Sequence, residues 1–584
     1  MENPLLELQE YENLQEALKK AKGPVQATGT LDSQKVHLMY WLGKDGGFPW
    51  KLVVTYDDQR AREIYDDFRS FTENVWLYPA KDLLFYSADI HGNLMTRQRI
   101  AVWRHLMEEK EGVVVTTLDG LMDHLLPLVF LKQQAVTVEN GQIMVIDLDV
   151  WKERLIAMGY ERVAQVDGMG QFSIRGGIVD IFPLTEEVPV RIELWDDEVD
   201  SIRSFDPESQ RSVEQLEKIT IYPSAETILT KKQLEAGIER LEKEEKEYEA
   251  ALRAKHQIEE ASRIRGIIKE LTEGIRQGWK RDGLDAYIRY FCPETVSFLD
   301  YFPAGDTLIC LDEPARLKEK GETVEQEFRE SMIHRLEKGY LLPGQTELLY
   351  AGAQVLAKLQ SSYTVMLTGL DQKLPGMKVK EKFSFDVRNV NSYQNSFDML
   401  ISDLTRWKKE SYRVVLLSAS RTRASRLASD LREYDLRAYC PDGTGEEHKA
   451  APGEILVTYG NIHRGFEYPL IKYVIITEGD MFGTEKKKKR RKKSNYQGKA
   501  IQSFSELAVG DYVVHEEHGL GIYKGIEKVE RDKVIKDYIK IEYGDGGNLY
   551  LPATRLESIQ KYAGADAKKP KLNKLGGTEW NKTK

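Results

Sequence analysis

The chain has 584 residues, of which 41% are hydrophobic and 30% are charged. This length predicts several domains, because single hydrophobic cores rarely grow beyond about 250 to 300 residues. The 84 Lys and Arg against 94 Asp and Glu give a net charge of −10, which excludes a globally basic protein, so any contact with nucleic acid must be local.

Targeting signals and cysteine motifs are both missing from the sequence. No apolar run approaches the length of a bilayer span, and the first residues lack the pattern of a signal peptide. We therefore expect a cytoplasmic protein that has no membrane partner. Cys292, Cys310 and Cys440 lie far apart without a CxxC pair, so neither a disulfide framework nor a metal site is indicated, and core positions are expected.

The first segment, residues 1–133, alternates apolar strands with amphipathic helices. Strand patterns at 51–56 and 112–117 are each followed by a helical pattern, which is typical of a parallel sheet. Residues 225–345 are expected to complete the first domain, and they contain an apolar strand that ends at Asp312 and Glu313.

Residues 134–224 are rich in strand patterns and are expected to be inserted into the first domain. Arg191 and Trp195 alternate with Ile192 and Leu194, so one face of a strand is apolar and the other carries an indole beside a guanidinium. Trp and Arg are frequent interface hot spots. Alternation alone also permits a Trp that packs over a neighbouring edge.

The helical pattern that begins at Leu234 has apolar residues three and four apart up to Leu252, interrupted at Glu245. We interpret it as a helix packed on its own domain rather than an intermolecular coiled coil.

Residues 346–485 then predict a small α/β domain. The basic run 486–493, within a linker at 486–503, is interpreted first as solvated chain, with a phosphate-contacting arm as the alternative.

Residues 504–565 change to short strands and glycine turns, which predict a small five-stranded barrel, and a lysine-rich tail follows at 566–584. Residues 507–562 hold ten acidic and eight basic side chains. This net negative charge does not favour binding to the phosphate backbone of a nucleic acid. It favours a contact with another protein through a strand edge.

Two motifs resemble a known family. RGGIVDIFP from Arg175, followed from Arg191 by R-x-E-x-W-D-D-E-x-D-S-I-R-x-F-D, resembles the second domain shared by UvrB and the transcription-repair coupling factor family (Mfd). The terminal segment resembles the RNA-polymerase-interacting domain that this family shares with CarD-type regulators. The positions that match the family's contact residues are Arg175, Arg191 and Trp195 for UvrA, and Ile526, Lys528 and Val529 for the RNA polymerase β subunit.

A nucleotide-driven motor needs a GxxxxGK loop followed by Ser or Thr, and no segment supplies it. Where a UvrB-like domain carries this loop, Thr28 and Gly29 are present, but Lys35 lacks the preceding glycine and the following hydroxyl. Asp312 and Glu313 resemble a Walker B pair. Without a phosphate loop we interpret them as a relic or a helix N-cap. No catalytic residue is assigned.

The resemblance implies an α/β multidomain fold: a degenerate UvrB-like motor domain with an inserted β-rich domain, a small α/β domain and an SH3/Tudor-like barrel. It implies the recruitment half of a transcription-coupled repair factor, which binds UvrA and RNA polymerase. In the full-length family, ATP and magnesium serve helicase-like motor domains that bind DNA and displace stalled polymerase, and no motif of those domains is present here. The alternatives are a UvrB-like excision subunit, disfavoured by the missing loop and by the short hairpin segment 85–99, and a CarD-like regulator.

Overall fold

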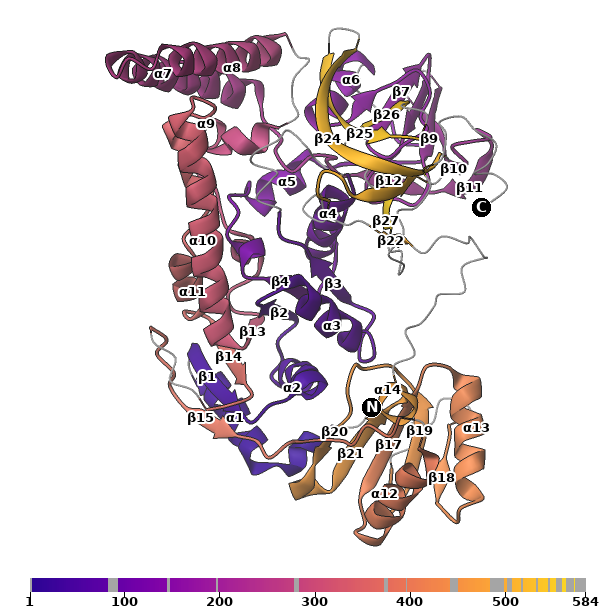
Figure 1. The fold of residues 1–584 in the computed structure, drawn as a ribbon. Helices are drawn as coiled ribbons and strands as arrows, with labels where there is room; N and C mark the ends of the chain where they lie inside the picture. The colour runs from indigo at the N-terminus through magenta and orange to yellow at the C-terminus, as the bar shows by residue number, and fades with distance from the viewer. Residues whose placement is uncertain are drawn as a thin grey trace.

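The computed structural model of the chain is shown in Figure 1. The structure describes residues 3–20, 22–81, 93–143, 148–195, 198–277, 283–371, 376–394, 396–441, 450–483, 498–500, 507–515, 518–531, 534–544, 547–552, 559–562 and 572. The basic run 486–493 and nearly all of the tail 566–584 lie outside these residues, as does most of the segment 85–99.

A seven-stranded sheet forms the centre of the first domain, with all strands parallel in the order β15-β1-β14-β13-β2-β4-β3. Leu52 and Val54 face one hydrophobic core and Val53 faces the other, as expected for a parallel sheet covered on both sides. The strands are β1 (Gly23–Thr28), β2 (Trp50–Thr55), β3 (Val75–Tyr78), β4 (Gly112–Thr117), β13 (Thr307–Asp312), β14 (Tyr363–Thr368) and β15 (Lys382–Ser384).

The first domain extends beyond the predicted boundary at residue 345. Strand β14 lies in the segment assigned from sequence to the small α/β domain, yet it pairs between β1 and β13, and β15 pairs with β1. A strand inside a sheet belongs to that sheet's domain, so the predicted boundary was wrong. The small domain begins after β15.

Helices cover both faces of this sheet. Asp57 accepts a hydrogen bond from the backbone N–H of Arg60 and thereby caps α3. The helices of the first domain are α1 (Gln9–Lys20), α2 (Asp32–Asp45), α3 (Asp58–Phe68), α4 (Asn93–Glu108), α5 (Leu128–Gln134), α9 (Ile288–Phe291), α10 (Pro314–Glu337) and α11 (Gly352–Leu359).

Two long helices, α7 (Lys231–Ala254) and α8 (Ile258–Arg276), form a hairpin at the upper left of Figure 1. A capping box between Thr230 and Gln233 begins α7. Leu234, Ile238 and Leu241 are buried in the same core as the first domain. The prediction of a helix packed on its own domain is therefore confirmed.

The inserted domain contains a six-stranded sheet in the order β11-β10-β9-β8-β7-β6 and a β12-β5 pair. Strands of the seven-stranded sheet come before and after it in the chain, so the domain is an insertion. Its elements are β5 (Val136–Glu139), α6 (Leu148–Ala157), β6 (Glu161–Arg162), β7 (Gln171–Arg175), β8 (Ile178–Ile181), β9 (Val190–Trp195), β10 (Glu198–Phe205), β11 (Ser212–Leu216) and β12 (Lys218–Ile221).

The small α/β domain has a sheet in the order β16-β20-β21-β17-β19-β18. One face packs on α12 and α13, while the other shares a core with the first domain through residues such as Tyr468. Its elements are β16 (Arg388–Asn389), α12 (Phe397–Lys409), β17 (Arg413–Ser418), α13 (Arg421–Arg432), β18 (Ala438–Tyr439), β19 (Ile455–Tyr459), β20 (Phe466–Tyr468), β21 (Tyr473–Thr477) and α14 (Glu478–Phe482).

The C-terminal strands form a sheet in the order β22-β27-β23-β24-β25-β26. Five of these strands lie within residues 504–565, the number predicted there, whereas β22 lies in the segment predicted as a linker. Within the described residues no pairing joins β22 to β26, so a closed barrel stays a prediction. The strands are β22 (Gly498–Ala500), β23 (Tyr512–His515), β24 (Gly519–Arg531), β25 (Val534–Glu542), β26 (Asn548–Pro552) and β27 (Ile559–Tyr562).

Cys292 and Cys310 are buried, whereas Cys440 is only half-buried, and none of the three forms a disulfide. No helix in the described part of the chain is long and apolar enough to cross a bilayer.

Candidate functional site

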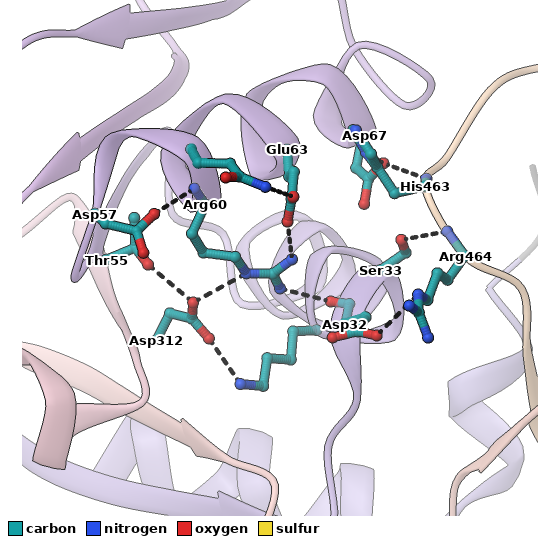
Figure 2. Close-up of polar contacts among 12 residues, drawn as sticks. Asp32, Ser33, Thr55, Asp57, Arg60, Glu63, Asp67, Asp312, His463 and Arg464 are labelled. Carbon is teal, nitrogen blue, oxygen red and sulfur yellow. Dashed lines mark hydrogen bonds and ion pairs between the residues drawn. The ribbon is translucent and has the colours of Figure 1, made fainter. Parts of the chain in front are cut away.

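The vestigial nucleotide site holds a buried ion network. Lys35 Nζ, on α2, donates to Asp312 Oδ1 at 2.7 Å and to Glu313 Oε1 at 2.6 Å. Thr55 Oγ1 and Arg60 Nε donate to the other oxygen of Asp312 at 2.9 and 3.2 Å (Figure 2). Lys35 and both Walker-B-like carboxylates thus meet in the structure, and the lysine is bound by them.

Burial alone would raise the pKa of Asp312, but the charges of Lys35 and Arg60 and the hydrogen bonds outweigh it and lower this pKa. Glu313 occupies the N-cap position of α10 at φ 50°, but its side chain makes no capping bond and instead accepts from Lys35 and from the N–H of Gly369. Glu313 thus holds the N-cap position, as one of the two interpretations has it, but without a side-chain capping bond.

Thr28 and Gly29 contact the backbone of β15 and of the residue that follows it. Thr28 Oγ1 donates to the carbonyl of Phe383 at 3.4 Å. At Gly29, φ is 73° and a Cβ would lie 2.2 Å from the carbonyl oxygen of Phe385. The segment after β1 is thus covered by the backbone that continues β15.

The start of α2 contacts the small α/β domain. Ser33 Oγ accepts from the N–H of Arg464 at 3.0 Å, and Asp32 lies 3.6 Å from Arg464 Nε. His463 contacts the buried Asp67 through its backbone N–H and Nδ1, both at 2.7 Å (Figure 2). This hydrogen bond raises the pKa of His463. The segment between β19 and β20, which carries His463 and Arg464, therefore joins the small α/β domain to the first domain beside the vestigial site.

In the inserted domain, a buried aspartate holds two of the predicted contact residues. Asp180, on β8, is directly opposite Arg191, on β9. Its carboxylate accepts from Arg191 Nε and Nη2 at 2.6 and 2.9 Å and from Arg175 Nη2 at 3.1 Å. Arg191 also lies over the Phe205 ring at 4.8 Å. The hydrogen bonds to Asp180 raise the pKa of Arg191. Together these bonds hold both guanidinium groups in a fixed orientation.

Trp195 ends β9 on the same side of the strand as Arg191, and its side chain is 80% exposed. Ile178 and Glu193 form a cross-strand pair between Arg191 and Trp195 on this face. The alternative that Trp195 packs over a neighbouring edge does not hold in this structure. The three predicted residues therefore share one accessible surface, which we call the Trp195 face.

Ile526, Lys528 and Val529 lie in β24, a strand that is paired on both sides only near its start. It pairs with β23 up to Ile522, and Tyr523 bonds to residues 510 and 511. From Gly525 to Arg531 the pairing found among the described residues is with β25 alone. The three residues thus lie along a strand edge that can accept another strand.

Two domain families match this chain. The UvrB interaction domain matches residues 136–226, which include the Trp195 face, and the CarD-like/TRCF RID domain matches residues 507–563, which include β24. A transcription-repair-coupling factor of Bacillus subtilis is 34% identical over 538 residues, and that of Staphylococcus haemolyticus is 32% identical over 540 residues.

The chain is therefore similar to the transcription-repair-coupling factors along most of its own length. The match covers 91% of this chain but only 44% and 45% of those two relatives, so the chain spans a little under half the length of the curated family members that it matches. A Staphylococcus aureus family member shows the same pattern, at 32% identity and 45% coverage.

Sequence reasoning missed two residues that organise these sites. Asp180 carries a usable signal, because it lies in the strand before Arg191 and alternates with apolar neighbours. Arg60 had no such signal, since its partner Asp312 is 252 residues away. Among the described residues, no group of three or more His, Cys, Asp or Glu is placed to hold a metal ion.

Proposed function

We propose that this chain is the recruitment part of a transcription-coupled repair factor: it binds UvrA through the Trp195 face and RNA polymerase through β24. The observation that carries the proposal is the exposed Trp195 beside two arginines that a single buried carboxylate orients. A rigid aromatic plate with pre-oriented guanidinium groups loses little entropy on binding.

The proposed contact with RNA polymerase is supported by the backbone geometry of β24. An exposed strand edge gives affinity through main-chain hydrogen bonds, and β24 offers such an edge from Gly525 to Arg531. The partner subunit that the family resemblance implies is the β subunit. We propose it as the strand donor.

The vestigial site does not fit magnesium ATP. Lys35 is neutralised by two carboxylates, Asp32 places a negative charge at the start of α2, and the backbone of Phe385 lies against Gly29. A phosphate would meet anions instead of free N–H groups and an unbound lysine. We propose that the chain alone hydrolyses no ATP, and that ATP, magnesium and DNA translocation belong to motor domains of the full-length family.

The ion network should stabilise the fold. Lys35→Met leaves Asp312 buried without its lysine, and we expect the free energy of unfolding to fall by about 3 to 5 kcal/mol. Addition of about 1 mM magnesium ATP should leave the urea midpoint of the wild-type chain unchanged, because only a ligand that binds the folded state stabilises it. Urea denaturation measures both effects.

Lys20→Met is the matched control, since Lys20 forms an exposed pair with Glu16, which contributes little. Asp312 has a lowered pKa in the folded state, so its contribution is fully present above the unfolded value of about 4 and is lost as the pH falls through the folded value. A rise of the urea midpoint with magnesium ATP that Lys35→Met abolishes would contradict the proposal.

The recruitment role itself is tested by bridging. RNA polymerase should be retained on immobilised UvrA only when this chain is present, since each partner occupies a different domain. Retention that does not depend on the chain, or retention of only one partner, would contradict the role of an adaptor.

A further inference from the structure

The small α/β domain has no role in the function proposed above, yet it carries a locally basic surface on an acidic protein. Helix α13 has the sequence RTRASRLASDLR, with four arginines and one acidic residue, while the whole chain has a net charge of −10. Its apolar side packs on the sheet through Ala424, Leu427, Ala428 and Leu431. Its outer side is therefore the basic one.

This outer side faces away from the rest of the molecule. The opposite face of the sheet shares its core with the first domain, whereas α12 and α13 cover the free face. Figure 1 shows α13 at the outer edge of the small domain. A long partner can reach it without displacing another part of the described chain.

Two of the arginines are available for a partner. Arg423 pairs with Glu478, and Arg432 donates to the carbonyl of Ala438. Arg421 and Arg426 are exposed, and neither has an ion pair within the part of the chain that the structure describes. Helix geometry, about 100° per residue, places exposed hydroxyl side chains between these two arginines; they are Thr422, Ser425 and Ser429.

An exposed aromatic ring lies beside this helix. Tyr459 ends β19 directly opposite Ser418, is 62% exposed, and follows Val457 on the face of the sheet that α13 covers. Arg423 reaches Glu478 at the end of β21, on one side of β17. Arg421, two residues earlier and about 200° around the helix, projects toward the other side, where Tyr459 lies.

We propose that Arg421, Arg426 and Tyr459 form a binding surface for single-stranded nucleic acid. Arginines and hydroxyl groups are the usual donors to phosphate oxygens. An exposed aromatic ring lets one base stack without regard to sequence. Charge complementarity favours a polyanion, because this surface is cationic although the chain as a whole has a net charge of −10. The inference does not depend on binding of UvrA or RNA polymerase.

Fluorescence anisotropy of the full chain with a labelled oligo-dT of about 20 nucleotides tests this surface. A plot of the logarithm of the association constant against the logarithm of the salt concentration has a negative slope. Arg421→Ala combined with Arg426→Ala should reduce the magnitude of this slope by about 1.4, since each phosphate contact contributes about 0.7. Tyr459→Ala should weaken binding to the single strand about fivefold or more and should change binding to duplex DNA little.

The matched control is Arg62→Ala with Arg329→Ala, two exposed arginines on α3 and α10, which should leave binding unchanged. Oligo-U in place of oligo-dT distinguishes RNA from DNA as the source of the strand, and saturable binding of either supports the surface. Wild-type binding that the α13 variant leaves unaltered would overturn the proposal and assign the contact to the basic run 486–493. Failure of the wild-type chain to bind either strand at low salt would also overturn it.

Discussion

Trp195→Ala combined with Arg191→Ala should weaken UvrA binding about thirtyfold or more. Loss of a buried hot-spot Trp or Arg typically costs 2 kcal/mol or more, and each 1.4 kcal/mol is a factor of ten in affinity. The fold should survive the tryptophan change, because this ring is 80% exposed and packs against little. Isothermal titration of purified UvrA into the chain measures the loss.

The matched control is Tyr340→Ala with Arg276→Ala, an exposed aromatic residue and an exposed arginine near the helical hairpin. It should leave UvrA affinity unchanged. Arg191→Lys separates charge from geometry, since a lysine cannot donate two parallel hydrogen bonds to Asp180. If the Trp195 and Arg191 double variant binds UvrA as the wild type does, the Trp195 face is not the docking surface.

Val529→Arg should abolish binding to the RNA polymerase β subunit, whereas Val529→Thr should reduce it only slightly. The backbone of β24 supplies the hydrogen bonds, so one side chain matters mainly by fitting or blocking the approaching strand. In the backbone register Val529 pairs with Lys536 of β25, so the opposite edge of β24 at this position is the one left for a partner strand. Surface plasmon resonance with isolated β-subunit fragments measures the effect.

Val213→Arg in the inserted domain is the matched control, because it makes the same change at an exposed valine far from β24 in the sequence. Circular dichroism should show that each variant keeps its strands. Raising the salt concentration should weaken the complex only modestly, unlike a phosphate contact, whose affinity falls steeply with salt. Full β-subunit affinity in Val529→Arg would show that the edge of β24 is not the contact.

The amino-acid sequence by itself determined the features that are local along the chain. Strands β2 and β4 lie where short apolar runs predicted them, because burial on both faces leaves a continuous hydrophobic signal. The alternation of Arg191 and Trp195 with Ile192 and Leu194 predicted which side of β9 is polar, since successive side chains point to opposite faces. The sequence also showed that a phosphate loop is missing, because all residues of that motif are contiguous in the chain.

The tertiary structure alone decided which distant residues meet. Lys35 and Asp312 are 277 residues apart, and no periodicity in the sequence records that α2 delivers the lysine to the end of β13. The placement of β14 between β1 and β13 likewise depends on parallel pairing across long connections, which overturned the predicted boundary at residue 345. The exposure of Trp195 and the meeting of Arg175 and Arg191 at Asp180 depend on strand register, which is set by the packing of the whole sheet.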